Sequence, residues 1–300
     1  MPDSQPQTSF EIAAARAAPA LFVVLWSTGF IATKYALASA GPLTFSTLRM
    51  IAAVILLGLL ALIVRPRWPN MTGVLHSIVA GLLVHGFYLG GTSVAISLAV
   101  PAGLSALVPG LQPVLTSTLA NAWLGERVTR LQWGGLALGL FGVLLVLHNR
   151  NVAGQAGWGW LGTFVALISI TLGTLYQKRF CADIDWRAGN LIQFAAAGTL
   201  FAIGASLFET RVVDWSAQFV FAVGWLVVVL SFGSIGLLYW LIRRAAATRV
   251  ASLFYLVPGV TALMAYLLFD ERLDPVSIAG IVICAAGVLL VNWSASFAAR

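Results

Sequence analysis

Four residues that could contact a small molecule recur at one spacing within an apolar stretch: Gly81, His85, Tyr88 and Thr92. Positions i, i+4, i+7 and i+11 lie on one face of an α-helix. An imidazole in the middle of an apolar helix is costly, and it is therefore a candidate for function. The side chains of His85 and Tyr88 form hydrogen bonds, and the Tyr88 ring can stack on a flat ligand. The pattern predicts one side of a site for a zwitterion with a flat side chain. The alternative is a neutral histidine bonded to the next helix.

Proline interrupts two other apolar stretches, at Pro109, Pro113 and Pro258. Proline lacks a backbone donor and clashes with the preceding turn, so it opens or kinks a helix. Ser105 and Gln112 share a helical face with Pro109, which favours the lining of a cavity. The alternative is that the prolines only shape the helix bundle.

Other side chains could hold a substrate by stacking or by charge. Tyr176 shares a helical face with Gly173 and Ser169, so its ring is a second candidate for stacking on an aromatic or cationic molecule. Arg49 falls about two turns inside an apolar stretch. It could attract a substrate carboxylate, or it could bond to the C-terminus of a neighbouring helix.

The acidic residues are informative because of where they are absent. All 10 Asp and Glu residues fall in expected tails, loops or helix ends. Proton-driven carriers often place a carboxylate in the transport pathway, so either His85 carries a proton or movement is downhill; we expect downhill movement. The cysteines and histidines show no metal-ligand spacing. We therefore expect no catalytic residues, no metal and no cofactor.

The chain as a whole has too few polar residues to form the surface of a water-soluble protein. Hydrophobic residues make up 60% of the 300 residues and charged residues only 9%, whereas soluble domains are about a quarter charged. Several apolar stretches reach about 20 residues, the length that a helix needs to cross a bilayer. The sequence predicts an all-α integral membrane protein with ten spans, at residues 17–37, 44–64, 75–98, 102–124, 131–148, 158–179, 187–208, 218–242, 247–269 and 275–293.

The basic residues indicate how these spans are oriented. Most Lys and Arg residues fall in loops on the side of the N-terminus, and the loops on the other side hold only Lys34, Arg150, Arg211 and Arg272. Because positively charged loops stay in the cytoplasm, we expect both termini there. The net charge of +7 is spread between the spans, so it indicates membrane orientation and not nucleic-acid binding.

The two halves of the chain carry the same motif. At an offset of 145 residues, Pro113 aligns with Pro258, Glu126-Arg127 with Glu271-Arg272, Gly135 with Gly280 and Gly142 with Gly287. A period near half the chain length indicates duplicated halves. Because each half holds five spans, an odd number, we expect the second half to be inverted relative to the first, with substrate bound between the halves, as in many secondary transporters. The alternative is that the duplication only builds a larger bundle.

The repeat divides the chain into five parts: a cytoplasmic tail (1–16), a first five-helix repeat (17–148), an external linker (149–157), a second, inverted repeat (158–293) and a second cytoplasmic tail (294–300). The two Glu-Arg pairs then fall at opposite membrane faces, so they cannot form one centre. Either they stabilise the ends of the two units as architecture, or they gate the two openings of the pathway.

These features resemble one known family. Proline in the fourth and ninth spans, Glu-Arg pairs at their ends and paired glycines after them are similar to the EamA-type drug/metabolite transporter superfamily. Within it, the chain is similar to bacterial exporters of aromatic amino acids and methyl viologen. The resemblance extends from about Ala17 to Trp293, and the second motif departs at Asp270, where the first has Gly125. It implies a basket of ten helices around a central cavity that exports small metabolites without ATP.

The function expected from the sequence is export of small amphipathic metabolites, aromatic amino acids above others, across the bacterial inner membrane by alternating access. The alternatives are export of other amino acids or quaternary ammonium drugs by proton exchange through His85 and, more remotely, an integral membrane enzyme. The expected partners are the lipid bilayer and the small-molecule substrate, without nucleic acid. Gly135 and Gly139 form a GxxxG motif, which packs helices closely. We expect this packing within one protomer, and so a monomer.

Overall fold

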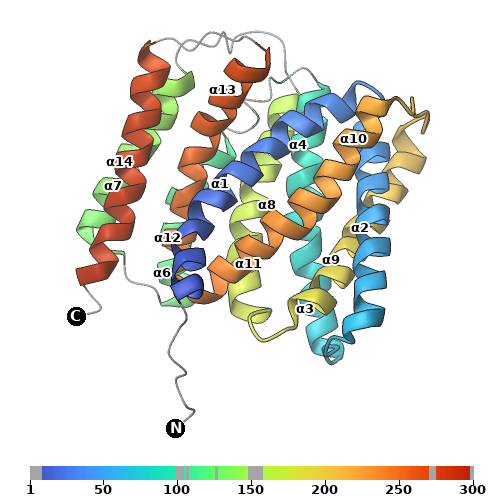
Figure 1. Ribbon diagram of the computed structural model, residues 1–300, viewed down its shortest axis with the longest axis horizontal. Helices are drawn as coiled ribbons and strands as arrows, with labels where there is room; N and C mark the ends of the chain where they lie inside the picture. Colours follow the sequence, from blue (N-terminus) through green and yellow to red (C-terminus); the bar gives the residue numbers. More distant parts are fainter. Residues whose placement is uncertain are drawn as a thin grey trace.

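The described part of the chain is a bundle of helices without a β-sheet. The computed structural model describes residues 9–98, 100, 105, 108–125, 128–147, 158–269 and 275–297, and the β-pairing within them is one isolated bridge between Ala40 and Val213. The start of α1 and the end of α14 lie at the same end of the bundle (Figure 1). The α-helices are α1 Ser9–Leu37, α2 Pro42–Val64, α3 Met71–Gly81, α4 Tyr88–Ser97, α6 Gln112–Leu124, α7 Arg130–Leu147, α8 Gly159–Phe180, α9 Trp186–Phe208, α10 Ala217–Trp225, α11 Ile235–Arg244, α12 Ala247–Ser252, α13 Leu256–Phe269 and α14 Pro275–Phe297.

Seven stretches of the described residues are long and apolar enough to cross a membrane: Ala17–Leu37, Pro42–Val64, Met71–Ser97, Gly159–Phe180, Trp186–Phe208, Ala217–Arg244 and Ala247–Leu268. Two shorter apolar helices, Arg130–Leu145 and Ile278–Val291, fall at the expected fifth and tenth spans. Within the expected fourth span, the α-helix α6 has 13 residues. The fold is therefore all-helical and of membrane type, whereas the count of ten spans stays a prediction.

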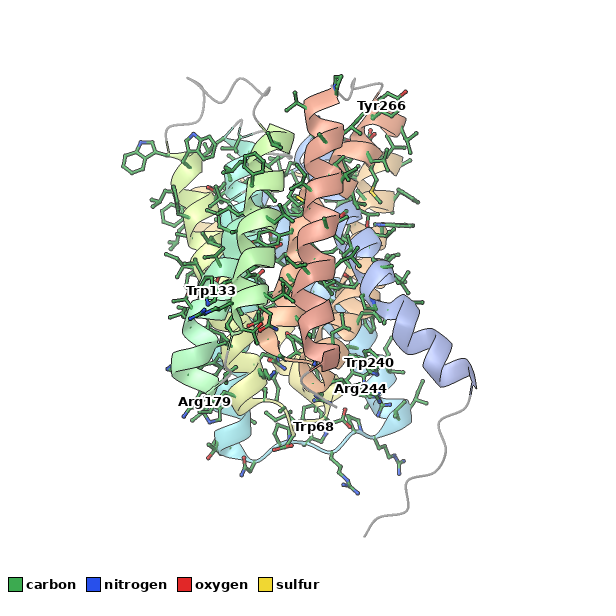
Figure 2. The ribbon with its side chains drawn as sticks, turned by 90° about the vertical axis from the view of Figure 1, so that its left-hand side faces the viewer. Trp68, Trp133, Arg179, Trp240, Arg244 and Tyr266 are labelled. Atoms are coloured by element: carbon green, nitrogen blue, oxygen red, sulfur yellow. The ribbon has the colours of Figure 1, made fainter. Side chains whose placement is uncertain are left out.

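The outside of the bundle is apolar along its length, as expected for a surface in contact with lipid. The side chains of Leu62, Ile63 and Phe208 are 75%, 81% and 79% exposed. Figure 2 shows such side chains projecting outward along the helices. It also shows Trp68, Arg179, Trp240 and Arg244 toward one end of the bundle and Tyr266 toward the other. That distribution is typical of a membrane–water interface.

Within the described residues, four segments depart from α-helical geometry, and they form two matched pairs. The π-helical segments η1 (Leu82–Phe87) and η3 (Leu226–Ser234) interrupt the third and eighth expected spans. The 3₁₀ segments η2 (Pro109–Leu111) and η4 (Leu253–Tyr255) interrupt the fourth and ninth. In each pair the second segment begins 144 residues after the first. π-helical turns occur often at functional sites, so these levels of the bundle are where a site is to be sought.

Glu209, in the connection after α9, caps the N-terminus of α2. The carboxylate of Glu209 accepts hydrogen bonds from the backbone nitrogens of Leu43 and Thr44, at 2.7 and 2.8 Å, and from the Thr44 hydroxyl at 2.6 Å. These are the first backbone donors of a helix, which otherwise have no partner. The backbone nitrogen of Asp214 donates to the carbonyl of Ser39 at 2.9 Å. The α1–α2 and α9–α10 connections therefore form one unit at this end of the bundle.

Candidate functional site

A pocket lies inside the bundle between helices from both halves of the sequence. Its cavity volume is about 40 Å³, and α1, α2 and α4 line one side of it while η3 and α11 contribute to the other. The lining residues with a polar or aromatic side chain are Trp26, Phe30, Thr33, Arg49, Tyr88 and Thr92. Two of these, Tyr88 and Thr92, are among the site residues expected from the sequence.

Arg49 is the one charged residue among the described residues that line this pocket. Its side chain is only 6% exposed. The Nη2 atom donates to the hydroxyl of Ser231 on η3 at 3.4 Å, at the long end of the hydrogen-bond range. The Nε atom finds no hydrogen-bond partner among the residues that the structure describes. A buried guanidinium with unused N–H groups can bind an anion.

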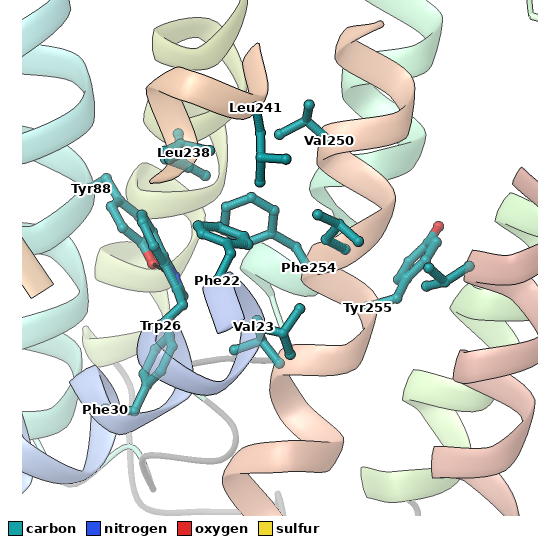
Figure 3. Close-up of a cluster of buried hydrophobic side chains, with 14 of the residues drawn as sticks. Phe22, Val23, Trp26, Phe30, Tyr88, Leu238, Leu241, Val250, Phe254 and Tyr255 are labelled. Carbon is teal, nitrogen blue, oxygen red and sulfur yellow. Dashed lines mark hydrogen bonds between the residues drawn. The ribbon is translucent and has the colours of Figure 1, made fainter. Parts of the chain in front are cut away.

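An aromatic surface covers another part of the pocket. The indole Nε1 of Trp26 donates to the Tyr88 hydroxyl at 3.1 Å, and the two rings stack with centroids 6.0 Å apart and planes inclined by 21°. Figure 3 shows Trp26 and Tyr88 side by side, next to Phe22, Phe30 and Phe254. The Thr92 hydroxyl donates to the backbone carbonyl of Tyr88 at 2.9 Å. Rings held in this way offer a preorganised face for an apolar or aromatic group.

His85 is fully buried and does not line the pocket. Its Nε2 lies 3.3 Å from the Tyr239 hydroxyl, and its ring lies against Phe194 with centroids 4.6 Å apart. The Tyr239 hydroxyl in turn donates to the side-chain oxygen of Gln193 at 2.7 Å. This geometry is that of the alternative interpretation, a histidine bonded to neighbouring helices. Its role in substrate binding stays a prediction.

Three other residues of the predicted site lie away from the pocket lining. A Cβ atom on Gly81 would lie 2.5 Å from the Cα of Gln193, and one on Gly173 would lie 2.6 Å from the Cγ2 of Val84. Both glycines are therefore positions of close helix packing. The Tyr176 hydroxyl lies 2.7 Å from Nδ1 of His76. The structure does not bring these three residues together with Tyr88.

Ser105 and Gln112 are fully buried beside the first proline-bearing segment. The side-chain nitrogen of Gln112 donates to the Thr174 hydroxyl on α8 at 3.2 Å. Its oxygen, and the hydroxyl of Ser105, find no partner within the described residues. Buried polar atoms of this kind usually have a partner, so this region remains a candidate for contact with a ligand or water.

The three prolines lie within or just after the 3₁₀ segments of their expected spans. Pro109 is the first residue of η2, and Pro113 and Pro258 fall in the first turns of α6 and α13. A Cβ atom on Gly110 would lie 3.7 Å from the ring of Pro258, so the two proline-bearing segments meet inside the bundle. Their role in gating stays a prediction.

The Glu-Arg pairs of the duplicated motif, Glu126-Arg127 and Glu271-Arg272, lie outside the described residues. The acidic residues that are described, Glu11, Asp183, Asp185, Glu209 and Asp214, all lie outside the seven membrane-spanning stretches. No group of three His, Cys, Asp or Glu that could hold a metal ion occurs in the described part of the chain. The positive charge of Arg49 is therefore the main electrostatic feature of the pocket.

Sequence reasoning named Arg49 but did not include it in the site, and it did not assign a role to Trp26 together with Tyr88. A signal for Arg49 was present in the sequence. An arginine about two turns inside a span is costly, and none of the 10 acidic residues falls in a span to pair with it. A signal for the Trp26–Tyr88 pair was absent, because it depends on which spans pack together.

Two stretches of the chain, residues 17–148 and 157–293, match the model of the EamA-like transporter family. The chain is 27% identical over 270 residues to the uncharacterized inner membrane transporter YedA of Escherichia coli (strain K12), with 90% of this chain and 87% of that protein covered. It is 28% identical over 283 residues to a probable amino-acid metabolite efflux pump of the same strain, with 90% and 92% covered.

A solved crystal structure aligns with this one at a TM-score of 0.76 and 22% sequence identity, over 96% of this chain and 99% of that chain. This likeness shows a shared fold. The two family matches together extend over most of the sequence, and the relatives are named as transporters. The chain therefore belongs to the EamA-like transporter family, and it is a transporter and not an enzyme.

Proposed function

We propose that this transporter exports small amphipathic metabolites, aromatic amino acids first among them, across the bacterial inner membrane by alternating access. The observation that carries the proposal is the pocket between the two halves of the chain, where Trp26 and Tyr88 stack beside the buried Arg49. Secondary transporters built from two repeats bind substrate at such an interface. The name of one relative, a probable amino-acid metabolite efflux pump, supports the same class of substrate.

The proposal includes ten spans arranged as two inverted repeats, residues 17–148 and 158–293, joined by an external linker at 149–157. The matched pairs of helix breaks, each offset by 144 residues, support this arrangement. A second support is the contact between α7 and α14. There the Cys284 thiol donates to the Gly139 carbonyl at 3.5 Å, and these two residues are 145 positions apart. Interrupted helices at corresponding places in two halves are typical of transporter binding sites.

The proposed orientation puts the tails 1–16 and 294–300 in the cytoplasm, and the proposed oligomeric state is a monomer. The end of the bundle where α1 begins and α14 ends is also where Arg179 and Arg244 lie (Figure 2). Basic residues on that side support a cytoplasmic location for both termini. Cysteine labelling from each side of a vesicle tests the orientation.

The proposed energetics are facilitated, downhill efflux. None of the acidic residues falls in the seven spanning stretches, where a proton-coupled carrier usually holds one. The alternative, proton exchange through His85 with export of other amino acids or quaternary ammonium drugs, has weaker support, because His85 lies outside the pocket lining and contacts Tyr239.

Counterflow in proteoliposomes tests the proposed function. Vesicles loaded with unlabelled phenylalanine should take up external labelled phenylalanine or tryptophan transiently, and empty vesicles should not. Absence of counterflow for every amino acid in a labelled panel would contradict the proposal. Imposing a pH gradient should not produce uphill accumulation; accumulation that the His85→Asn variant abolishes would establish the proton-exchange alternative instead.

A further inference from the structure

We infer that Arg49 binds the carboxylate of the transported molecule, and that the substrates are aromatic monocarboxylates with or without an amino group. Organic cations are thereby excluded as substrates of this pocket. The inference rests on the proposed function, because it takes the pocket around Arg49 as the transport site. It goes further by naming the chemical group that the site recognises.

The buried charge of Arg49 is not balanced by an acidic side chain among the described residues. The Arg49 side chain is 6% exposed, and its Nε has no partner among the residues that the structure describes. Moving a cation out of water without a partner is expensive. None of the acidic residues of the sequence falls in the seven spanning stretches. Glu209, directly after one of them, uses its carboxylate on Leu43 and Thr44. An anionic ligand would compensate the charge that the protein itself leaves unpaired.

Arg49 has neither of the two other roles that an arginine in a membrane span can have. A snorkelling arginine turns its head toward the headgroups, whereas the Arg49 guanidinium turns inward to Ser231 on η3. An architectural arginine bonds to the free carbonyls of a helix end. The hydrogen bond that Arg49 does form is to the Ser231 hydroxyl at 3.4 Å, at the long end of the hydrogen-bond range. The contact is too weak to account for a buried guanidinium.

The pocket lining sets the shape of the ligand. Tyr88, Trp26 and Phe30 line the same pocket as Arg49. The Tyr88 hydroxyl accepts from Trp26 at 3.1 Å, and its own proton has no acceptor among the described residues. A carboxylate on Arg49 could therefore receive the Tyr88 proton as well, and the rest of the molecule would lie against the rings. Bidentate binding by arginine favours a planar carboxylate, and one guanidinium balances the charge of a monocarboxylate but not of a phosphate dianion.

The described lining of the pocket contains no acidic side chain that could pair with an ammonium. An ammonium must then lose water for uncharged oxygens alone, which is unfavourable in a buried pocket. The carboxylate, and not the amino group, is therefore the recognised end of an amino acid. A deaminated analogue is expected to bind at least as tightly as the amino acid.

Competition against labelled 3-phenylpropionate, on the full-length protein in detergent, tests this ligand preference. The competitors are phenylalanine, phenylalaninamide and benzyltrimethylammonium, which share the ring and differ in charge. We expect phenylalanine and unlabelled 3-phenylpropionate to compete, and the amide and the ammonium compound to compete at least about tenfold less well, since a charge-assisted hydrogen bond is worth roughly one to two powers of ten in affinity. Equal competition by benzyltrimethylammonium would overturn the inference.

Substitution of Arg49 tests the assignment to this residue. Arg49→Gln should weaken 3-phenylpropionate binding by about 10- to 100-fold. Arg49→Lys should retain part of the affinity, because it keeps the charge but loses the planar fork. The matched control is Arg249→Gln, since Arg249 also has an Nε without a described partner and lies outside the pocket lining. Unchanged carboxylate binding in both Arg49 variants would overturn the inference.

The unfolding temperature distinguishes a ligand-binding role of Arg49 from a structural one. Removal of an unpaired buried cation should leave the unfolding temperature of Arg49→Gln equal to or above that of the parent. The inference would be overturned if three results came together: a lower unfolding temperature for Arg49→Gln, the same decrease for Ser231→Ala, and an unchanged ligand preference in Arg49→Lys. Arg49 would then have a structural role. If Arg49→Gln does not fold, Arg49→Lys alone decides: full affinity and preference in that variant count against the inference, and reduced carboxylate affinity supports it.

The two proposals fail in distinguishable ways. Arg49-dependent binding of 3-phenylpropionate without counterflow would remove the proposed export function and leave the carboxylate site. Phenylalanine counterflow that persists in Arg49→Gln, with the same preference for carboxylates over amides, would remove the carboxylate site and leave the export function.

Discussion

A Cβ atom placed on Gly135 of α7 would lie 2.8 Å from the carbonyl oxygen of Gly287 on α14. A Cβ atom placed on Gly142 would lie 2.7 Å from the carbonyl oxygen of Gly280. In the aligned halves, Gly280 corresponds to Gly135 and Gly287 to Gly142. The Gly135–Gly287 contact and the Gly142–Gly280 contact are therefore equivalent, with the two halves exchanged. Exchange of equivalent contacts is what a two-fold relation between two halves requires. The two helices also run in opposite directions, since the earlier glycine of α7 meets the later glycine of α14.

Gly135→Ala should therefore destabilise the protein. The new methyl group would contact the backbone of α14, which cannot move without separating the two helices, and overpacking of this kind costs about 1–3 kcal/mol. The matched control is the neighbouring Gly134→Ala, where the nearest atom is a Leu290 methyl at 4.0 Å. We expect the free energy of unfolding, measured by denaturation with SDS in mixed micelles, to fall for Gly135→Ala and to stay unchanged for Gly134→Ala. Equal values for the two variants would mean that α7 and α14 do not approach so closely.

The helices were largely predictable from the sequence, because each is an apolar run bounded by polar, proline or glycine residues. The expected span 187–208 is found at Trp186–Phe208, and the expected span 44–64 is found at Pro42–Val64. The prolines at 109 and 258 also indicated the 3₁₀ breaks η2 and η4. The π-helical segments η1 and η3 carry no comparable signal, since neither contains a proline.

The same π-helical segment explains why only part of the predicted site assembled. Gly81, His85 and Tyr88 share one face only if the chain keeps the period of an α-helix. Residues Leu82–Phe87 instead form η1, in which each turn holds more residues, so the direction of the side chains changes across the segment. Tyr88 and Thr92 follow it on α4 and line the pocket, whereas His85 lies within it and contacts Tyr239 and Phe194.

Tyr88→Phe should weaken both stability and transport. Loss of the hydroxyl leaves the buried indole N–H of Trp26 without its acceptor, which costs about 1–3 kcal/mol. It also removes a polar group from the pocket while the stacked rings remain. We expect a lower free energy of unfolding in SDS titration and slower phenylalanine counterflow per folded protein. Tyr266→Phe is the control, since Tyr266 is 43% exposed. A Tyr88→Phe variant with the stability and transport of the parent would disprove a role for this hydrogen bond.

Glu209→Gln should destabilise the end of the bundle at which α2 begins. The Glu209 carboxylate accepts three hydrogen bonds, from two backbone nitrogens and one hydroxyl. An amide replaces one accepting oxygen with a donor that faces another N–H group, and loss of a helix cap costs about 0.5–2 kcal/mol. Hydrogen exchange at Leu43 and Thr44 should accelerate in the variant. Asp214→Asn is the control, since the described contact of Asp214 at this end is made by its backbone. The proposed capping role is lost if exchange is the same in both variants.

Cys181 should be an unreactive thiol at neutral pH. It lies between α8 and α9, outside the spanning stretches, and is only 1% exposed. Burial raises the pKa of its thiol from 9.0 to about 11, and the positive charge of Arg243 partly opposes this rise. Because the thiolate is the reactive form, maleimide labelling in a Cys284→Ala background should be slow at pH 7 and should increase as the pH approaches 11. Arg243→Gln should raise the pKa further and slow the labelling at pH 10, whereas Arg244→Gln, whose guanidinium lies 4.4 Å above the Trp240 ring, should not. Rapid labelling of Cys181 at pH 7 would show that the thiol is neither buried nor protonated.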